Sequence, residues 1–149
     1  MSARLSPLNS TLLVVDVQEK LLAVMPDAAG LVRDVGFLLD VANLLKVPAI
    51  ATEQYPQGLG PTHPDLVQRL MSDRPTKLAF SCCGAPGLLT ELKQQSRPNV
   101  VVAGMEAHVC VMQTVLDLLA EGLQVFVPVD GVQSRFAIDQ ETALRRMDK

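Results

Sequence analysis

Three residues of this chain carry side chains that together could perform nucleophilic chemistry on a carbonyl group: Asp16, Lys77 and Cys110. A cysteine supplies the nucleophile, a carboxylate accepts the thiol proton, and a lysine ammonium stabilises developing negative charge. Each also has an ordinary structural use, because Asp caps turns, Lys is usually solvated, and free Cys is often a small buried hydrophobe. The chemistry therefore depends on whether the fold brings the three side chains together.

Each of the three lies within or shortly after a segment whose pattern is typical of a β-strand. Short apolar runs rich in β-branched residues predict buried strands. The expected strands are Thr11–Val17, Pro48–Thr52, Asn99–Ala103 and Gln124–Val129, with a shorter and more polar candidate at Thr76–Phe80. Helical patterns separate them at Leu31–Leu45, Pro64–Met71, Pro86–Gln95 and Cys110–Glu121, and a last helix is expected from Asp139 to Lys149.

Strands that alternate with helices predict an α/β fold, here a single domain over residues 1–149. We expect a three-layer α/β/α sandwich with a doubly wound, mostly parallel, Rossmann-like sheet. Ligands of such sheets bind beyond the carboxyl ends of the strands, where Asp16, Lys77 and Cys110 are expected to converge. Cys110 would lie near the N-terminus of a helix, where free N–H groups and the helix dipole favour an anion and lower a thiol pKa.

The composition excludes several classes of function. With 48% hydrophobic and 19% charged residues the chain is not typical of disorder, and its net charge of -3 gives no electrostatic reason to bind nucleic acid or an anionic membrane. Three cysteines, of which Cys82 and Cys83 are adjacent, form neither a disulfide framework nor a zinc-ligand spacing. Met1–Ser10 lacks a signal-peptide pattern and no apolar run approaches the roughly 20 residues that span a bilayer, so we expect a cytoplasmic protein.

Four segments, taken together, resemble the isochorismatase-like cysteine hydrolases, a family that includes nicotinamidases and N-carbamoylsarcosine amidohydrolases. The resemblance extends from about Asn9 to the end of the chain. The matching segments are Leu13–Gln18, Pro75–Lys77, Gly104–Val111 and Asp130–Arg135. The Thr52–Tyr55 and Glu106–Cys110 stretches are most similar to the uncharacterised isochorismatase-domain proteins.

The resemblance implies a catalytic triad of Asp16, Lys77 and Cys110 in an isochorismatase-like hydrolase fold. It also implies a cis peptide bond between Met105 and Glu106, and an oxyanion hole formed by the backbone N–H groups of Glu106 and Cys110. In the implied reaction Asp16 takes the thiol proton, the thiolate attacks a carbonyl carbon, and Lys77 helps to stabilise the oxyanion. An amine or ammonia then leaves and water cleaves the thioester, so the expected substrate is a small molecule with an amide or related C–N bond.

The sequence departs from the nicotinamidase pattern at the metal site. Nicotinamidases carry an Asp-x-His motif after the second strand, whereas this chain reads Glu-Gln-Tyr-Pro at residues 53–56 and His63 stands alone. We therefore expect neither a metal nor another cofactor. The expected substrate-binding rim comprises Gln18, Gln54, Tyr55 and Phe80. A dyad of Cys110 with His108 is disfavoured, since residues two apart point to different sides of a helix.

The end of the chain also differs from the family pattern. Members usually continue with one more strand and helix, whereas this sequence stops at Lys149 within its last expected helix, so that C-terminal strand and helix are expected to be missing. The sheet would then have about five strands and an open edge beside Gln124–Val129, and pairing at that edge favours a homo-oligomer. The main alternative function is a catalytically silent hydrolase-like scaffold that binds a partner. A dinucleotide site is disfavoured, because Gln-Glu-Lys at 18–20 replaces the required glycines.

Overall fold

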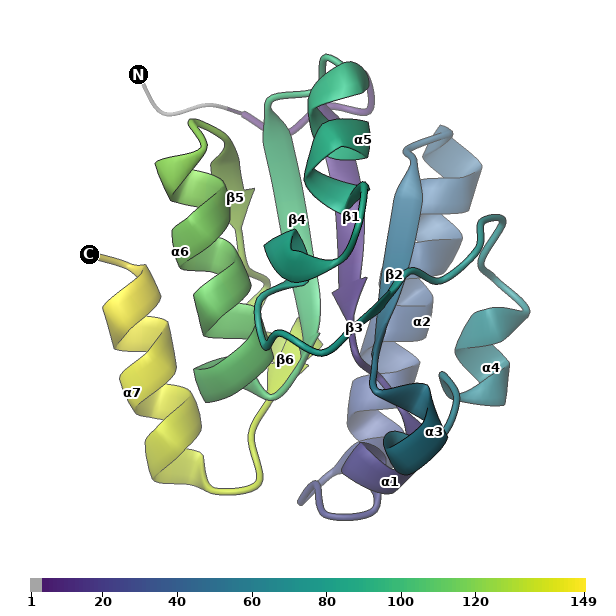
Figure 1. The fold of residues 1–149 in the computed structure, drawn as a ribbon, viewed down its shortest axis with the longest axis vertical. Coiled ribbons are helices and arrows are strands. Elements are labelled where there is room, and N and C mark those ends of the chain that lie inside the picture. Colours follow the sequence, from purple (N-terminus) through teal and green to yellow (C-terminus); the bar gives the residue numbers. More distant parts are fainter. Residues whose placement is uncertain (1–3) are drawn as a thin grey trace.

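The computed structural model describes residues 4–149 and shows strands alternating with helices (Figure 1). Residues 1–3, part of the segment expected to carry no signal peptide, lie outside the described residues. In chain order the elements are β1 (Ser10–Val15), α1 (Glu19–Leu22), α2 (Ala28–Leu45), β2 (Ala49–Gln54), α3 (Pro56–Leu59), α4 (Pro64–Val67), β3 (Thr76–Lys77), α5 (Leu88–Gln94), β4 (Asn99–Met105), α6 (Met112–Ala120), β5 (Gln124–Phe126), β6 (Val132–Gln133) and α7 (Ala137–Met147). Two 3₁₀ turns, Cys82–Gly84 and Val129–Gly131, and a π-helical turn, Ala107–Val111, lie between them.

The strands form one parallel sheet in the order β3-β2-β1-β4-β5, and β6 pairs with the end of β4. The chain winds outward from β1 to β3 and then returns to place β4 on the other side of β1. This reversal defines a doubly wound sheet, so the predicted fold class is confirmed. The point of reversal lies between β1 and β4, and ligands of such folds bind beyond the strand ends there. Asp16 follows β1 and the turn with Cys110 follows β4.

Successive residues of β1 face opposite layers of the molecule. Leu12 and Val14 pack with the apolar side of α2, whereas Leu13 and Val15 belong to the core that includes residues of α5, α6 and α7. Figure 1 shows α2 and α6 on opposite sides of the sheet. Burial of each such side chain contributes about 1.5–3 kcal/mol, so both faces hold the central strands firmly.

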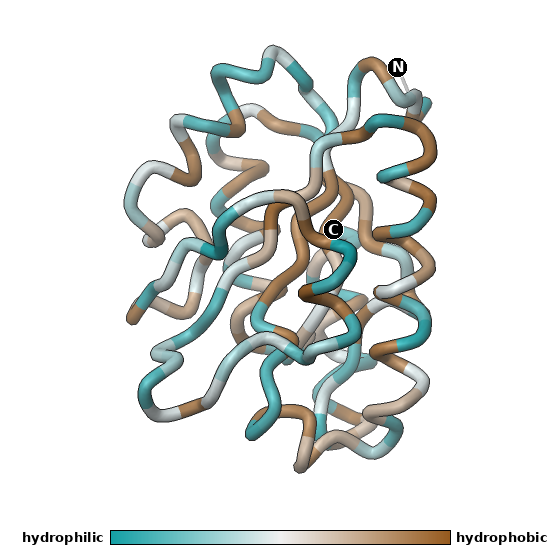
Figure 2. The backbone as a smooth tube through the Cα atoms, turned by 90° about the vertical axis from the view of Figure 1, so that its right-hand side faces the viewer, coloured by the Kyte–Doolittle hydropathy of each residue, from teal (hydrophilic) through white to brown (hydrophobic). Residues whose placement is uncertain are grey.

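The distribution of hydropathy follows these layers. Figure 2 shows apolar stretches gathered along the strands in the interior, while the helices alternate apolar and polar residues. α2, the longest helix, buries Leu31, Val35 and Leu39 and exposes Phe37 and Leu44. No helix within residues 4–149 combines the length and apolar character needed to cross a bilayer.

The structure corrects several predicted element boundaries. β3 contains only Thr76 and Lys77 rather than extending to Phe80, because the next carbonyl groups turn toward the Lys77 ammonium. The helix expected at Pro64–Met71 ends at Val67. β5 stops at Phe126, and β6, a sixth strand, takes up the pairing with Gly104 and Met105.

Candidate active site

Asp16 is the first residue after β1 and the chain turns sharply there. Its φ of 51° lies in the left-handed region, which Asp tolerates better than most residues, and its carbonyl accepts the Gln18 N–H at 2.8 Å. The residue is fully buried. Its carboxylate accepts the Thr52 hydroxyl on Oδ1 at 2.8 Å and the Lys77 ammonium on Oδ2 at 2.7 Å. The Asp16 side chain is therefore held on both oxygens by donors from β2 and β3.

Lys77 lies on β3 and its ammonium is surrounded by oxygen acceptors. Besides Asp16 Oδ2, Nζ contacts Gln54 Oε1 at 2.7 Å, the Phe80 carbonyl at 2.8 Å and the Ala79 carbonyl at 3.2 Å. An ammonium has three protons, and four protein acceptors already share them. These four contacts hold the Lys77 ammonium in one position beneath the surface. Lys77 thus supplies a fixed positive charge next to Asp16.

Cys110 reaches the same carboxylate from the other side of β1. β4 ends at Met105, the Met105–Glu106 peptide bond is cis, and Cys110 then lies in the π-helical turn before α6. π-helical turns are rare and are often found at functional sites. The Cys110 side chain is almost fully buried, and the negative charge of Asp16 acts on its thiol. The three predicted triad residues therefore meet at one carboxylate.

The expectation of a lowered Cys110 pKa is wrong for the resting site. Burial and the negative charge of Asp16 raise the pKa of the Cys110 thiol to about 12, against the opposing charge of Lys77. Nearby negative charge and desolvation outweigh any effect of the helix N-terminus, because both disfavour a thiolate directly. The resting Cys110 side chain is thus a neutral thiol beside the Asp16 side chain.

Gly104 sets the spacing between the ends of β1 and β4. It lies opposite Val15 and has a φ of +123°. A Cβ atom at this position would lie 2.1 Å from the Val15 carbonyl oxygen, so only glycine fits. The close approach of the two backbones at this point fixes where the turn with Cys110 begins relative to Asp16.

The turn that carries Cys110 is also anchored from β6 and the segment after it. The Glu106 carboxylate accepts hydrogen bonds from the Arg135 guanidinium at 2.8 Å and from the Arg135 backbone N–H at 3.2 Å. Although burial alone would raise the pKa of Glu106, these bonds and the Arg135 charge bring it below its ordinary value. His108 Nδ1 lies 2.9 Å from the Ser134 hydroxyl, so the His108 ring is tied to the segment after β6.

The four residues expected at the substrate rim occupy two different environments. Gln18 is fully buried, and its amide bonds to the backbone of Gln54 and Gly60, so it joins two loops beneath the surface. The Gln54 side chain bridges Lys77 Nζ and the Leu78 carbonyl. Tyr55 and Phe80 are about half exposed, at 50% and 54%. Only these last two present substantial surface to a ligand.

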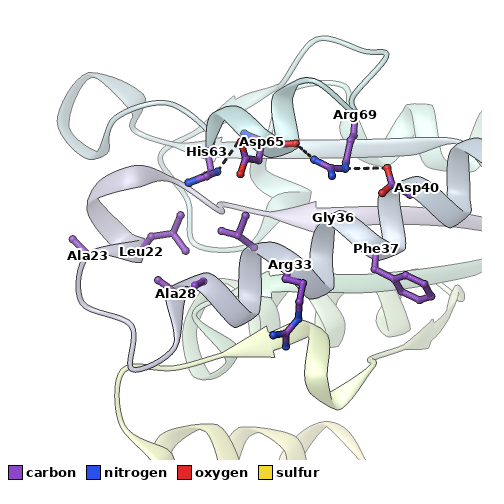
Figure 3. A pocket seen from close by; sticks show the side chains of 12 residues that line it. Leu22, Ala23, Ala28, Arg33, Gly36, Phe37, Asp40, His63, Asp65 and Arg69 are labelled. Carbon is purple, nitrogen blue, oxygen red and sulfur yellow. Dashed lines mark hydrogen bonds and ion pairs between the residues drawn. The ribbon is translucent and has the colours of Figure 1, made fainter.

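Two of the surface hollows differ in their position relative to the triad. The larger, about 740 Å³, lies between α2 and the segment from His63 to Arg69, and none of the triad residues lines it (Figure 3). Arg69 within it is paired with Asp40. The second, about 520 Å³, adjoins Lys77 and is lined by Tyr55, Leu78, Gly84 and their neighbours. The second hollow is therefore lined by one member of the predicted triad, Lys77, and by neither Asp16 nor Cys110.

Residues 4–149 contain no cluster of three or more His, Cys, Asp or Glu side chains arranged to hold a metal ion. The sequence pattern did not single out three further residues near the triad: Thr52, Thr114 and Cys82. Each is fully buried next to Asp16 or Cys110. The available signals were a threonine within an apolar strand and another one helical turn after Cys110. Neither of these sequence features predicts which group accepts a hydrogen bond from the threonine hydroxyl.

Known proteins share this fold and much of this sequence. Human isochorismatase domain-containing protein 2 is 44% identical over 148 residues, which covers 97% of this chain and 69% of the relative. The MAR1 ribonuclease from Caenorhabditis elegans is 42% identical with a TM-score of 0.90, covering 98% of this chain and 76% of that one. YcaC from Pseudomonas aeruginosa, solved with hexane-2,5-diol and covalent acrylamide, is 26% identical with a TM-score of 0.88, covering 99% of this chain and 76% of that one.

YcaC from Escherichia coli, described as an octameric hydrolase of unknown specificity, has a TM-score of 0.87 and 26% identity, covering 99% of this chain and 75% of that one. The family model for the isochorismatase domain matches residues 10–149, which includes every residue of the site described above. The chain therefore belongs to the isochorismatase domain family.

Proposed function

We propose that this protein is a cysteine-dependent hydrolase of a small amide or related C–N bond substrate, with Cys110 as nucleophile. The observation that carries the proposal is the Asp16 carboxylate, which is fully buried, paired with Lys77 and positioned to influence the Cys110 thiol. A neutral thiol and an ionised carboxylate form the reactant state of a coupled proton transfer. Membership of the isochorismatase domain family supports hydrolase chemistry. The buried pair of Asp16 and Lys77 beside the Cys110 thiol supports a cysteine-dependent reaction.

In the first half of the proposed reaction, the Cys110 proton moves to Asp16 while the sulfur attacks the carbonyl carbon. The new C–S bond places the former π electrons on oxygen, where the N–H groups of Glu106 and Cys110 stabilise the charge. Asp16 then returns its proton to the leaving nitrogen as the C–N bond breaks. The products of this half are an amine and a thioester on Cys110.

In the second half, water attacks the thioester and gives a proton to Asp16. The tetrahedral intermediate collapses, the C–S bond breaks, and the sulfur regains a proton from Asp16. Lys77 takes no part in these proton transfers, and its ammonium holds Asp16 in place through the 2.7 Å contact with Oδ2. Tyr55 and Phe80 contact the substrate at the surface, while Gln18 and Gln54 hold the loops and Lys77 in place.

Relatives bear on this proposal in two ways. Covalent acrylamide in YcaC supports a site that reacts with small electrophiles. The name of the C. elegans relative makes RNA cleavage a candidate to be tested alongside amides, although a net charge of -3 gives this chain little general attraction to RNA.

A cytoplasmic homo-oligomer also belongs to the proposal, supported by three free cysteines and the octameric YcaC. A molar mass of one chain, measured by light scattering, would contradict the proposed homo-oligomer.

The proposed chemistry is tested with a panel of small amides and a structureless RNA, each given to the wild type and to Cys110→Ala. We expect wild-type turnover of at least one amide and a rate at least about 1000-fold lower in Cys110→Ala, because the variant lacks the nucleophile. Intact-mass measurement of rapidly quenched samples should show the acyl group on Cys110. Cleavage of RNA alone would contradict the amide assignment, and inactivity towards every substrate would favour the silent scaffold.

The pH dependence of labelling tests whether Asp16 assists Cys110. A free thiol with a pKa of about 12 gains reactivity by about tenfold per pH unit across the range from pH 6 to 9. Since the carboxylate takes the proton during attack, we expect acrylamide to label Cys110 at a nearly constant rate over this range. Cys83, partly buried and with its pKa raised above the ordinary value chiefly by burial, serves as internal reference and should show the rising profile. Parallel profiles for both cysteines would count against base assistance.

A further inference from the structure

A fully buried chain of hydrogen bonds runs behind the triad. Thr52 Oγ1 lies 2.8 Å from Asp16 Oδ1 and 3.3 Å from Cys82 Sγ. The Cys82 backbone N–H donates to Thr114 Oγ1 at 2.8 Å, and the Thr114 hydroxyl donates to the Cys110 carbonyl at 2.6 Å. All of these residues except Cys110 are fully buried, so water does not compete for the bonds. The chain connects the base to the backbone of the nucleophile.

The direction of each proton in this chain follows from the number of donors. An ionised carboxylate only accepts, so the single hydroxyl proton of Thr52 is committed to Asp16. Thr52 can then only accept from Cys82, which makes the Cys82 thiol the donor. In the same way, Thr114 commits its one proton to the Cys110 carbonyl and accepts the Cys82 N–H. Cys82 therefore uses both of its donors, one for each threonine.

This assignment requires Cys82 to remain a neutral thiol. Burial and the negative charge of Asp16 raise the pKa of Cys82 to about 11, against the opposing charge of Lys77. The S–H proton is thus retained at neutral pH. Cys82 lies on the 3₁₀ turn Cys82–Gly84, shortly beyond Lys77, so the same segment supplies both the cation and the thiol. Nothing in the proposed reaction uses Cys82 as a nucleophile.

We infer that Cys82 is a positioning residue that sets the geometry of Asp16 through Thr52 and that of Cys110 through Thr114. The inference rests on the proposed function, because it assigns Cys82 a part in the reactivity of Cys110. The Thr52 hydroxyl holds Asp16 Oδ1, and the Thr114 hydroxyl holds the Cys110 carbonyl oxygen. The titratable groups facing Asp16 are Lys77 on β3, Cys110 on the π-helical turn and Cys82 itself.

The test measures the rate at which acrylamide modifies Cys110 as a function of pH, read by peptide mass spectrometry. At low pH the labelling rate should fall, and we call this part of the profile the acidic limb. Thr52→Val keeps the shape of the side chain and removes its hydroxyl. In this variant the acidic limb should move up by about 1 pH unit, because the carboxylate loses a charge-assisted hydrogen bond. Thr52→Ser should restore the wild-type limb. Cys82→Ala should shift the limb in the same direction by less, and Cys82→Ser, which retains a donor, should return it toward wild type.

Thr11→Val is the matched control. It removes another buried threonine hydroxyl from β1, one that bonds Gln95 at 2.7 Å at the far end of the strand. It should lower stability without moving the pH profile. A Thr52→Val profile that coincides with wild type would overturn the inference, as would a Cys82→Ser limb no closer to wild type than that of Cys82→Ala. Failure of acrylamide to modify wild-type Cys110 would instead count against the proposed function.

Discussion

Lys77→Met is expected to lower the free energy of unfolding by about 3–5 kcal/mol and the amide turnover by about 100-fold or more. The substitution leaves the Asp16 carboxylate fully buried without the cation that lies 2.7 Å away in the wild type. An uncompensated buried charge is costly, so the carboxylate would take up a proton and could no longer accept one from Cys110. Urea denaturation and steady-state kinetics measure the two effects.

The double variant Asp16→Asn/Lys77→Met separates coupling from simple loss of packing. Asp16→Asn alone leaves the Lys77 ammonium buried with only neutral acceptors from Gln54 and the backbone. Removing both charges should cost less than the sum of the two single losses, with an interaction energy of at least about 2 kcal/mol. In all three variants turnover should be lower by about 100-fold or more. Strictly additive losses of stability would show that the two residues are not an energetic pair.

Gly104→Ala is the second substitution expected to have a large effect, a loss of about 2–5 kcal/mol in unfolding free energy. The added methyl group would lie 2.1 Å from the Val15 carbonyl oxygen and 2.7 Å from the Val15 nitrogen. Neither atom belongs to a flexible side chain, so the two central strands must separate. Because Asp16 and the turn with Cys110 begin at this point, the rate of Cys110 labelling should also fall. Thermal denaturation and the labelling assay measure these changes.

Gly122→Ala provides a control that shares the positive φ but not the contact. Gly122 has a φ of +83°, and a Cβ added there would meet no atom within 4 Å. Alanine at this position should therefore cost about 1 kcal/mol and leave labelling unchanged. Similar losses in the two variants would mean that backbone strain, rather than the approach of β1 and β4, accounts for the effect at Gly104.

The layered fold could be predicted because its central strands are short apolar runs, which are typical of buried parallel strands. Thr11–Val17 and Asn99–Ala103 read as short apolar runs, and the structure places β1 and β4 there as neighbours in the centre of the sheet. Short polar strands do not have an apolar pattern by which the sequence could predict them. β6 consists of Val132 and Gln133 alone and owes its pairing to the end of β4, so no local pattern marks it.

The members of the candidate triad could be picked out from the sequence, but not their electrostatic state. Position near a helix start indicated an anionic Cys110, whereas the pKa depends on burial and on Asp16, which are properties of the assembled site. The same limit applies to Lys77, whose four acceptors come from the end of β1, from β2 and from the loop after β3. The sequence identifies Lys77 as a cation, but it does not predict how many oxygen atoms accept hydrogen bonds from the ammonium.

β4 takes its partners from two separate stretches of chain, β5 along its first half and β6 at Gly104 and Met105. The turn after β4 is then held by Ser134 and Arg135, which a ribosome adds more than twenty residues after Cys110. The central strands β1 and β4 leave the ribosome ahead of these clamps. The contacts that hold the turn with Cys110 are therefore completed only once the segment through Arg135 has joined the fold.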